Sequence, residues 1–426
     1  MKKKTNPIIY LIATIIILIA VGIYAIEMKK EDRKQKEEPI VLLNNDFNID
    51  IIKIINSKED SNYLISPYSI EIALTLLKEG TAEESYNQIN KVIPNRNINI
   101  FEVKDRISVA NAIFIRNSEK ENISKDYINK LQKSYKADLI YDKFETPDKI
   151  NNWVNDKTYG MIPKILEGKM SKDFVLGLAN AVAIDLEWSN QFKCIETSKE
   201  DFITSDGIQK VEMMNKNYGK VSYILNDNEK GIILPYISYK SNGEYDYSDS
   251  EDSTKFEFIA IMPTKESIKE YVNNLTNDKL NNILNSIKET KDNQELNLKL
   301  PRFEYDYDDK HFKEDLIALG ISDVFNPDIA NLSKMKSSNN NDQLYVNSAI
   351  HKTHISLNEK GTKAAAVTYF GIEKNTAMIE EKEQINIEFT KPFMYIIRDT
   401  KTKEMLFFGV VESPNKWNGT TCTKTN

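Results

Sequence analysis

The sequence predicts an α+β fold in which helices surround large mixed β-sheets. Apolar residues recur at helical spacing in the first third of the chain. Runs rich in Val, Ile and Phe, with turn residues nearby, dominate the last third. Because the two kinds of element do not alternate regularly, a repeated βαβ array is not expected.

Two helices are predicted early in the chain. Four apolar residues form the first stripe at helical spacing: Phe47, Ile51, Ile54 and Ile55. Before the second stripe, Ser66 supplies a cap residue and Pro67 a first-turn proline, and Gly80 follows its end. We interpret both stripes as the core-facing sides of helices.

Later runs of β-branched and aromatic residues are predicted to be strands: 108–116, 178–186, 256–262, 295–300, 395–397 and 405–410. Residues 238–255 instead carry five acidic residues among serines and tyrosines. We expect an exposed, mobile loop there, of unassigned role. A calcium site is the alternative, although the spacing does not match an EF-hand loop.

Composition excludes several classes of function. The chain has 57 Lys and Arg against 64 Asp and Glu, intermixed along the sequence, whereas nucleic-acid binding needs clustered basic residues. Cys194 and Cys422 are too few for a disulfide framework or a four-ligand zinc site. The sequence leaves open whether these two cysteines pair.

The N-terminus predicts export. Lys2, Lys3 and Lys4 precede the uncharged run 8–26, which is long enough to span a bilayer. We expect residues 1–27 to be a signal-anchor, with a cleaved signal peptide as the alternative. Residues 28–40 are predicted to form a charged tether between the membrane segment and the domain. The protein is therefore expected at the cell membrane with an extracellular domain, or secreted.

The usual catalytic signatures are absent from the sequence: it has no nucleophile elbow, zinc-binding helix, Walker loop or dinucleotide fingerprint. His351 and His354 would point to opposite faces of a strand, so chelation of one metal by both is not expected. We predict a protein that is not an enzyme and that has no metal site and no cofactor.

The informative segment is Asn358-Glu359-Lys360-Gly361-Thr362-Lys363-Ala364-Ala365-Ala366-Val367-Thr368, which leads to Lys391-Pro392-Phe393. It resembles the hinge and reactive-centre loop of the serpin family. Further matches follow in the family's order: 66–70, 150–154 with Thr158, Asn180-Ala181 before Trp188 and Phe192, 234–236, and 407–411 with Pro414. The chain resembles a membrane-anchored or secreted serpin of bacterial type over residues 41–417, followed by a polar tail, 418–426.

The chemistry of this loop supports the resemblance. In an extended strand, Thr362, Ala364 and Ala366 share an uncharged face, while Lys363 and Glu373 share the other. Such a segment could enter a sheet and leave its charges in water, with small residues leading. An ordinary surface loop or a permanently paired edge strand is the alternative.

The resemblance implies a monomeric suicide-substrate inhibitor of an extracellular serine protease, with a cysteine protease as the alternative target. The protease would form a covalent acyl-enzyme complex, trapped when the cleaved loop inserts into the large sheet of a metastable fold. Partners would be this protease and, through the N-terminal helix, the membrane, without nucleic acid. A non-inhibitory serpin acting as a binding or structural module and an exported hydrolase are the alternatives.

The resemblance also implies roles for single residues. The reactive-centre loop would cover about 359–391. The hinge would contain Glu359, Gly361, Thr362, Ala364, Ala365 and Ala366. Gating residues of the shutter would be Ser66, Asn180 and His351, and those of the breach would be Trp188, Glu359 and Arg302, with Arg302 placed to pair with Glu359.

The scissile bond is less sharply defined. The family's spacing from Gly361 places it between Asn375 and Thr376. Lys374 is the alternative for a trypsin-like target, and Met378 for a subtilisin-like or chymotrypsin-like one.

Overall fold

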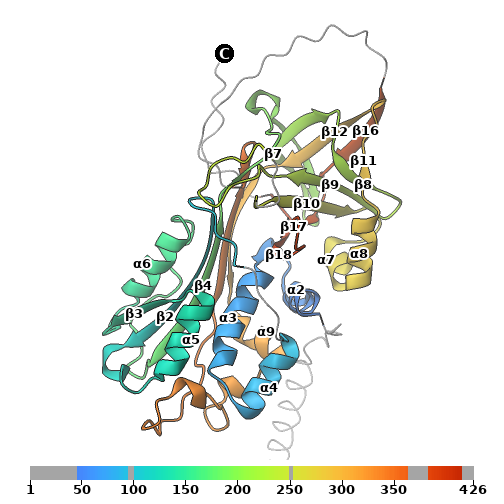
Figure 1. Ribbon diagram of the computed structural model, residues 1–426. Helices are drawn as coiled ribbons and strands as arrows, with labels where there is room; N and C mark the ends of the chain where they lie inside the picture. The colour runs from blue at the N-terminus through green and yellow to red at the C-terminus, as the bar shows by residue number, and fades with distance from the viewer. Residues whose placement is uncertain (1–45, 95–99, 249–252, 363–381, 415–426) are drawn as a thin grey trace, which may run out of the picture. The chain divides into compact units, whose positions relative to one another are not determined.

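The computed structural model describes residues 46–94, 100–248, 253–362 and 382–414, which belong to one compact unit, Leu43–Asn426. These residues form eight helices and eighteen strands (Figure 1). The strands gather into four sheets with helices packed against them. The predicted α+β class is confirmed.

The largest sheet has seven antiparallel strands and forms much of the core. Its order is β1 (Tyr63–Ile65), β18 (Met405–Val411), β17 (Phe393–Asp399), β10 (Phe256–Pro263), β9 (Glu229–Pro235), β8 (Ser222–Leu225) and β11 (Lys288–Glu289). Every residue of β18 is buried. This explains why its sequence is a continuous apolar run instead of an alternating one.

A second sheet contains β16 (Glu383–Glu388), β12 (Gln294–Pro301), β7 (Gly207–Tyr218) and β6 (Ser198–Thr204). Its β12 and β16 are parallel, and the other neighbours are antiparallel. The predicted reactive-centre loop, about 359–391, extends too far at its C-terminal end, because β16 lies within this range and is paired with β12 as a strand of this sheet.

Two smaller sheets position the candidate site. One contains β3 (Asp138–Asp142), β2 (Ile107–Arg116) and β4 (Leu176–Ile184). The other contains β13 (Phe303–Asp309), β14 (His351–Leu357), β15 (Gly361–Thr362) and β5 (Leu186–Glu187). Only Asp185 separates β4 from β5, so one stretch of chain contributes to both sheets.

The helices cover these sheets. They are α2 (Phe47–Lys58), α3 (Pro67–Glu79), α4 (Glu83–Val92), α5 (Lys125–Tyr135), α6 (Asp148–Lys157), α7 (Ile268–Asn273), α8 (Asn277–Asn285) and α9 (Phe312–Ala318). Helix α6 lies over β2 and β4 (Figure 1), where Trp153 packs edge-on against Phe114. Helix α3 contacts β4 and β18, which places its first turn beneath the candidate site.

Both early helices are confirmed as predicted. Ser66 caps α3 by accepting a hydrogen bond from the Ser69 amide at 3.1 Å, and Pro67 occupies the first turn. Gly80 is its C-cap, where a Cβ atom would lie 2.3 Å from the Met335 side chain. The six predicted strands correspond to β2, β4 with β5, β10, β12, β17 and β18.

The expectation of an exposed loop at residues 238–255 is confirmed only in part: most of residues 240–248 are exposed and irregular, but the described part of the segment is anchored at buried positions. Tyr239, Asp246 and Ser253 are buried, and Tyr239 forms β-bridges with Tyr245 and Thr254. Aromatic burial therefore outweighs the acidic composition here. No helix within the described ranges is both long and apolar enough to span a bilayer. The predicted anchor, tether and tail lie outside these ranges.

Candidate functional site

The first residues of the candidate hinge already form a strand. In β15, Gly361 pairs with Glu187 and Thr362 pairs with Leu186, both antiparallel. On its other side Thr362 pairs with Leu357 of β14. Strand β15 therefore separates β14 from β5, and both of its residues are buried.

Glycine is required at position 361 by this close approach. A Cβ atom there would lie 2.0 Å from the Leu186 carbonyl oxygen and 2.8 Å from the Glu187 Cα atom. Any larger residue would push β15 away from β5. The backbone pairing thus gives a physical reason for the glycine that the family resemblance marked.

Trp188 lies directly beside this strand. Its amide donates to the Lys360 carbonyl at 2.8 Å, and its indole N–H donates to the Asn358 carbonyl at 2.9 Å. The indole stacks on Tyr236, with ring centroids 4.6 Å apart and an interplanar angle of 9°. The Tyr236 hydroxyl lies 2.6 Å from the Thr362 hydroxyl. Trp188 and Tyr236 therefore hold the described part of the hinge, up to Thr362, at both of its ends.

A buried ion pair holds the turn before β15. The Arg302 guanidinium lies 3.3 Å from the Glu359 carboxylate and 3.2 Å from that of Glu212. Thr197 donates a hydrogen bond to Glu359 at 2.6 Å. The side chains of Arg302 and Glu359 are only 3% and 4% exposed, so their charges are largely withdrawn from water.

The candidate shutter residues meet at the first turn of α3. The Ser66 hydroxyl donates to the Leu406 carbonyl at 2.6 Å, and the Ser66 amide donates to His351 Nε2 at 3.2 Å. On the neighbouring sheet, Asn180 of β4 is hydrogen-bonded to the Ser69 hydroxyl. The start of α3 therefore links β14 through His351 and β4 through Asn180.

Asn180 also donates to the Asn111 side chain of β2 at 2.9 Å. Burial lowers the pKa of His351 to about 4, so the imidazole is neutral at pH 7. A neutral ring is what the contact with Ser66 requires, since Nε2 must be unprotonated to accept the hydrogen bond from the Ser66 amide. The shutter is thus a network of uncharged polar groups.

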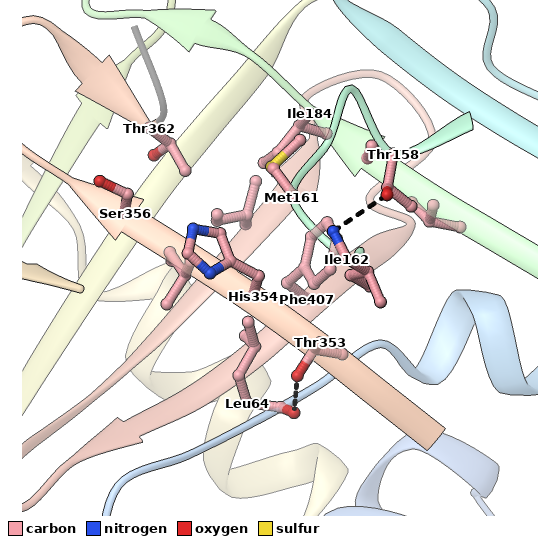
Figure 2. Close-up of a pocket in the computed structure, with 14 residues that line it drawn as sticks. Leu64, Thr158, Met161, Ile162, Ile184, Thr353, His354, Ser356, Thr362 and Phe407 are labelled. Carbon is pink, nitrogen blue, oxygen red and sulfur yellow. Dashed lines mark hydrogen bonds between the residues drawn. The ribbon is translucent and has the colours of Figure 1, made fainter. Parts of the chain in front are cut away.

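A narrow cavity lies between β4 and β14, below β15. Its volume is about 20 Å³, and Ile184 of β4 faces Thr353 and Ser356 of β14 across it. Figure 2 shows Thr362 at this cavity together with Met161 from the segment after α6. Within the described ranges no ladder joins β4 to β14. These strand edges therefore face each other without pairing, directly in line with β15.

The structure brings together most of the residues that the sequence marked. Gly361, Thr362, Glu359, Trp188 and Arg302 surround the top of the gap, and Ser66, Asn180 and His351 lie at α3. Other marked residues lie outside the described ranges: Ala364, Ala365, Ala366, Lys374, Asn375, Thr376 and Met378. Sequence reasoning missed Ser69 and Asn111, which ordinary polar composition does not distinguish.

The described residues include one of the two cysteines and both histidines that the sequence singled out. Cys194 is in a disulfide bond, and the second cysteine of the sequence, Cys422, lies outside the described ranges. His351 and His354 both lie on β14, and their environments fit the expected opposite faces. His351 is buried, whereas His354 is hydrogen-bonded to Asp306. The described residues contain no group of three His, Cys, Asp or Glu placed to hold a metal ion.

Comparison with known proteins agrees with this geometry. The family model for serpin (serine protease inhibitor) matches residues 42–414. The leukocyte elastase inhibitor of Xenopus tropicalis is 28% identical over 86% of this chain and 97% of its own length. A serpin-like protein of Thermococcus kodakarensis is 25% identical over 90% of this chain and 87% of its own.

Solved structures show the same fold. The thermophilic serpin tengpin in its native state is 31% identical, with a TM-score of 0.71 over 87% of this chain and 92% of that chain. Uncleaved ovalbumin, at 22% identity, has a TM-score of 0.69 over 88% and 100% of the two chains and shares the fold. The family model covers most of the sequence, and the chain therefore belongs to the serpin family.

Proposed function

We propose that this chain is a suicide-substrate inhibitor of an extracellular serine protease, with a cysteine protease as the alternative target. One observation carries the proposal: the hinge residues Gly361 and Thr362 already lie as a strand between β14 and β5. Below them the facing edges of β4 and β14 are unpaired among the described residues. The sheet is therefore arranged to accept the residues that follow Thr362.

The chemistry belongs to the protease. Its serine or cysteine attacks the carbonyl carbon of the residue before the scissile bond, and the peptide bond breaks. The new amine leaves with a proton from the protease's general acid, and the loop stays bound as an ester or thioester. The proposed bond is Asn375–Thr376, with Lys374 and Met378 as the alternatives before the cut. The inhibitor supplies no catalytic group.

Insertion then competes with hydrolysis of this acyl-enzyme. Successive residues that enter between β4 and β14 add backbone hydrogen bonds alternately to one strand and to the other, which drives the loop forward. The cavity of about 20 Å³ is too small for a strand, so the two edges must move apart first. Thr362 is 3% exposed. It is the first residue of the uncharged face that is proposed to be buried when the loop inserts.

The comparisons support inhibition in general terms. The Xenopus relative, 28% identical to this chain, is named as an inhibitor of leukocyte elastase. This name supports inhibition of a protease, and the protease panel below identifies the target.

The proposal includes a location and an oligomeric state. We place the inhibitor, as a monomer of bacterial type, at the cell membrane through residues 1–27, or in the medium if this segment is cleaved. The support is the uncharged run 8–26 after Lys2, Lys3 and Lys4. Fractionation of cells that express the full chain tests this location. The anchor is supported if only detergent releases the protein from the membranes.

The test of inhibition uses the full chain in a mild detergent with a panel of serine and cysteine proteases. Denaturing gels under reducing conditions detect a covalent complex, and reduction is needed because Cys194 is disulfide-bonded. Mass spectrometry of the released C-terminal fragment identifies the scissile bond. A complex that survives denaturation supports inhibition, whereas clean cleavage by every protease favours a non-inhibitory binding module.

A further inference from the structure

Residues 236–248, here called the tyrosine segment, cover the upper end of β5. Tyr239 is fully buried and Tyr245 is half-buried, whereas Tyr247 is 88% exposed. The part of the chain that was expected to be a mobile acidic loop therefore contributes two anchored aromatic rings beside the hinge.

Both anchored rings gather around Glu187. The Glu187 carboxylate accepts hydrogen bonds from Arg106 at 3.1 Å, from the Tyr245 hydroxyl at 2.8 Å and from Gln191 at 3.1 Å. The Arg106 guanidinium lies 5.2 Å from the ring centre of Tyr239 and 5.8 Å from that of Tyr245. Glu187 is 6% exposed, so these contacts form in a largely dry environment.

The backbone of β5 is bonded on both edges. Trp188 donates to Lys360 at 2.8 Å on the hinge side. Ile237 donates to the Glu187 carbonyl at 2.8 Å, and the Glu187 amide donates to the Tyr239 hydroxyl at 3.3 Å. Because neighbouring residues of a strand direct their backbone groups to opposite edges, the tyrosine segment holds the edge that the hinge does not.

The same segment is tied to the start of β2. The Lys104 amide donates to the Ser241 carbonyl at 3.1 Å. Gly243 has φ +86°, and a Cβ atom there would lie 2.3 Å from the Lys104 carbonyl oxygen. Asp185, between β4 and β5, donates to the Arg106 carbonyl at 2.7 Å. The top of β5 cannot shift sideways without straining these contacts.

We propose that Arg106, Glu187, Tyr239 and Tyr245, together called the tyrosine latch, are positioning residues that hold β5 against the hinge and oppose widening of the gap below it. The latch opposes separation of β5 from β14 and thereby sets how fast the residues that follow Thr362 can insert. The inference deepens the proposed function. The effect of the latch on inhibition rests on that function, whereas its effect on the position of β5 does not.

The direct test is hydrogen exchange of the intact full chain. The variant Tyr245→Phe removes one hydrogen bond to a buried carboxylate and retains the ring. Tyr247→Phe is the matched control, since it makes the same change on an exposed ring of the same segment. We expect the Trp188 amide to exchange at least about ten-fold faster in Tyr245→Phe than in Tyr247→Phe, with the amides of β17 unchanged.

The second readout is the rate at which the intact chain, held at elevated temperature, becomes resistant to urea. We expect this conversion to quicken in Tyr245→Phe and not in Tyr247→Phe. Equal Trp188 exchange in the two variants, or faster exchange throughout β17, would overturn the latch. Neither readout needs a target protease, so a latch effect without any covalent complex would reject inhibition and retain the latch.

Discussion

Arg302 and Glu359 form an ion pair at 3.3 Å that is almost completely buried. Neither residue belongs to the hinge strand β15. Arg302 lies between β12 and β13, and Glu359 lies in the turn between β14 and β15. The pair therefore connects the chain between β12 and β13 to the turn that precedes β15. A disturbance of this contact acts on the residues that are proposed to insert first.

Replacing Arg302 by methionine should be strongly destabilising. Glu359 and Glu212 would keep their charges without this partner, at a cost of about 3 kcal/mol in the free energy of unfolding. Urea denaturation measures the change. Lys210→Met, which breaks an exposed pair with Asp201, is the control and should leave the urea midpoint unchanged. Equal midpoints for Arg302→Met and the unaltered chain would contradict the argument.

Thr362→Arg should convert the inhibitor into a substrate. The Thr362 side chain is buried between β14 and β5, and a guanidinium in this position would be buried without an anion. Cleavage by the target should then occur without covalent complex, as seen on denaturing gels. Thr362→Val keeps the shape and loses only the bond to Tyr236, so it should still form complex. A stable complex with Thr362→Arg would contradict the insertion model.

His351 should make stability depend on pH. Burial lowers its pKa to about 4, below its value of about 6.5 in the unfolded chain. The unfolded state therefore binds the proton more readily, and stability is lost as pH falls from 6.5 to 4, by about 3 kcal/mol. His351→Gln should abolish this part of the pH dependence of the urea midpoint. His354→Gln, on the other face of β14, is the control and should retain it.

Asp309 should act in the opposite sense. Burial, and then the charge of Asp315, raise the pKa of Asp309 to about 7. The folded state binds the proton more readily, so this contribution to stability is present at low pH and is lost as pH rises through 7. Asp309→Asn should be more stable than the unaltered chain at pH 8 and similar to it at pH 3, as measured by the urea midpoint at the two pH values. Asp306→Asn, exposed on the same strand, should show no such gain.

Much of the fold could be predicted because its signals are local. Ser66, Pro67 and Gly80 mark the ends of α3 through capping chemistry, which needs no tertiary information. Continuous apolar runs predict β10, β17 and β18 because these strands are buried on both faces. The partnership of Arg302 with Glu359 came from a family resemblance, since the two positions are too far apart in sequence for any periodicity to connect them.

Other features could not be predicted from the sequence. Within the described residues, strand β15 comprises only Gly361 and Thr362, too few for an alternating pattern, and its pairing depends on where β5 lies. The tyrosine segment looked exposed because acidic residues surround Tyr239 and Tyr245, and only the structure shows Arg106 and Glu187 beside them. Ser69 and Asn111 acquire their importance from neighbours that lie far away in sequence.

The facing edges of β4 and β14 have a consequence for how the protein behaves at different concentrations. An unpaired edge accepts a strand from any chain, including a second copy. The loop's own residues follow Thr362 directly, so their effective concentration at the gap is of the order of millimolar. Dilute protein should therefore fill the gap from within its own chain. Crowding many copies together raises the competing concentration, so protein concentration becomes a variable that decides between self-insertion and exchange of strands.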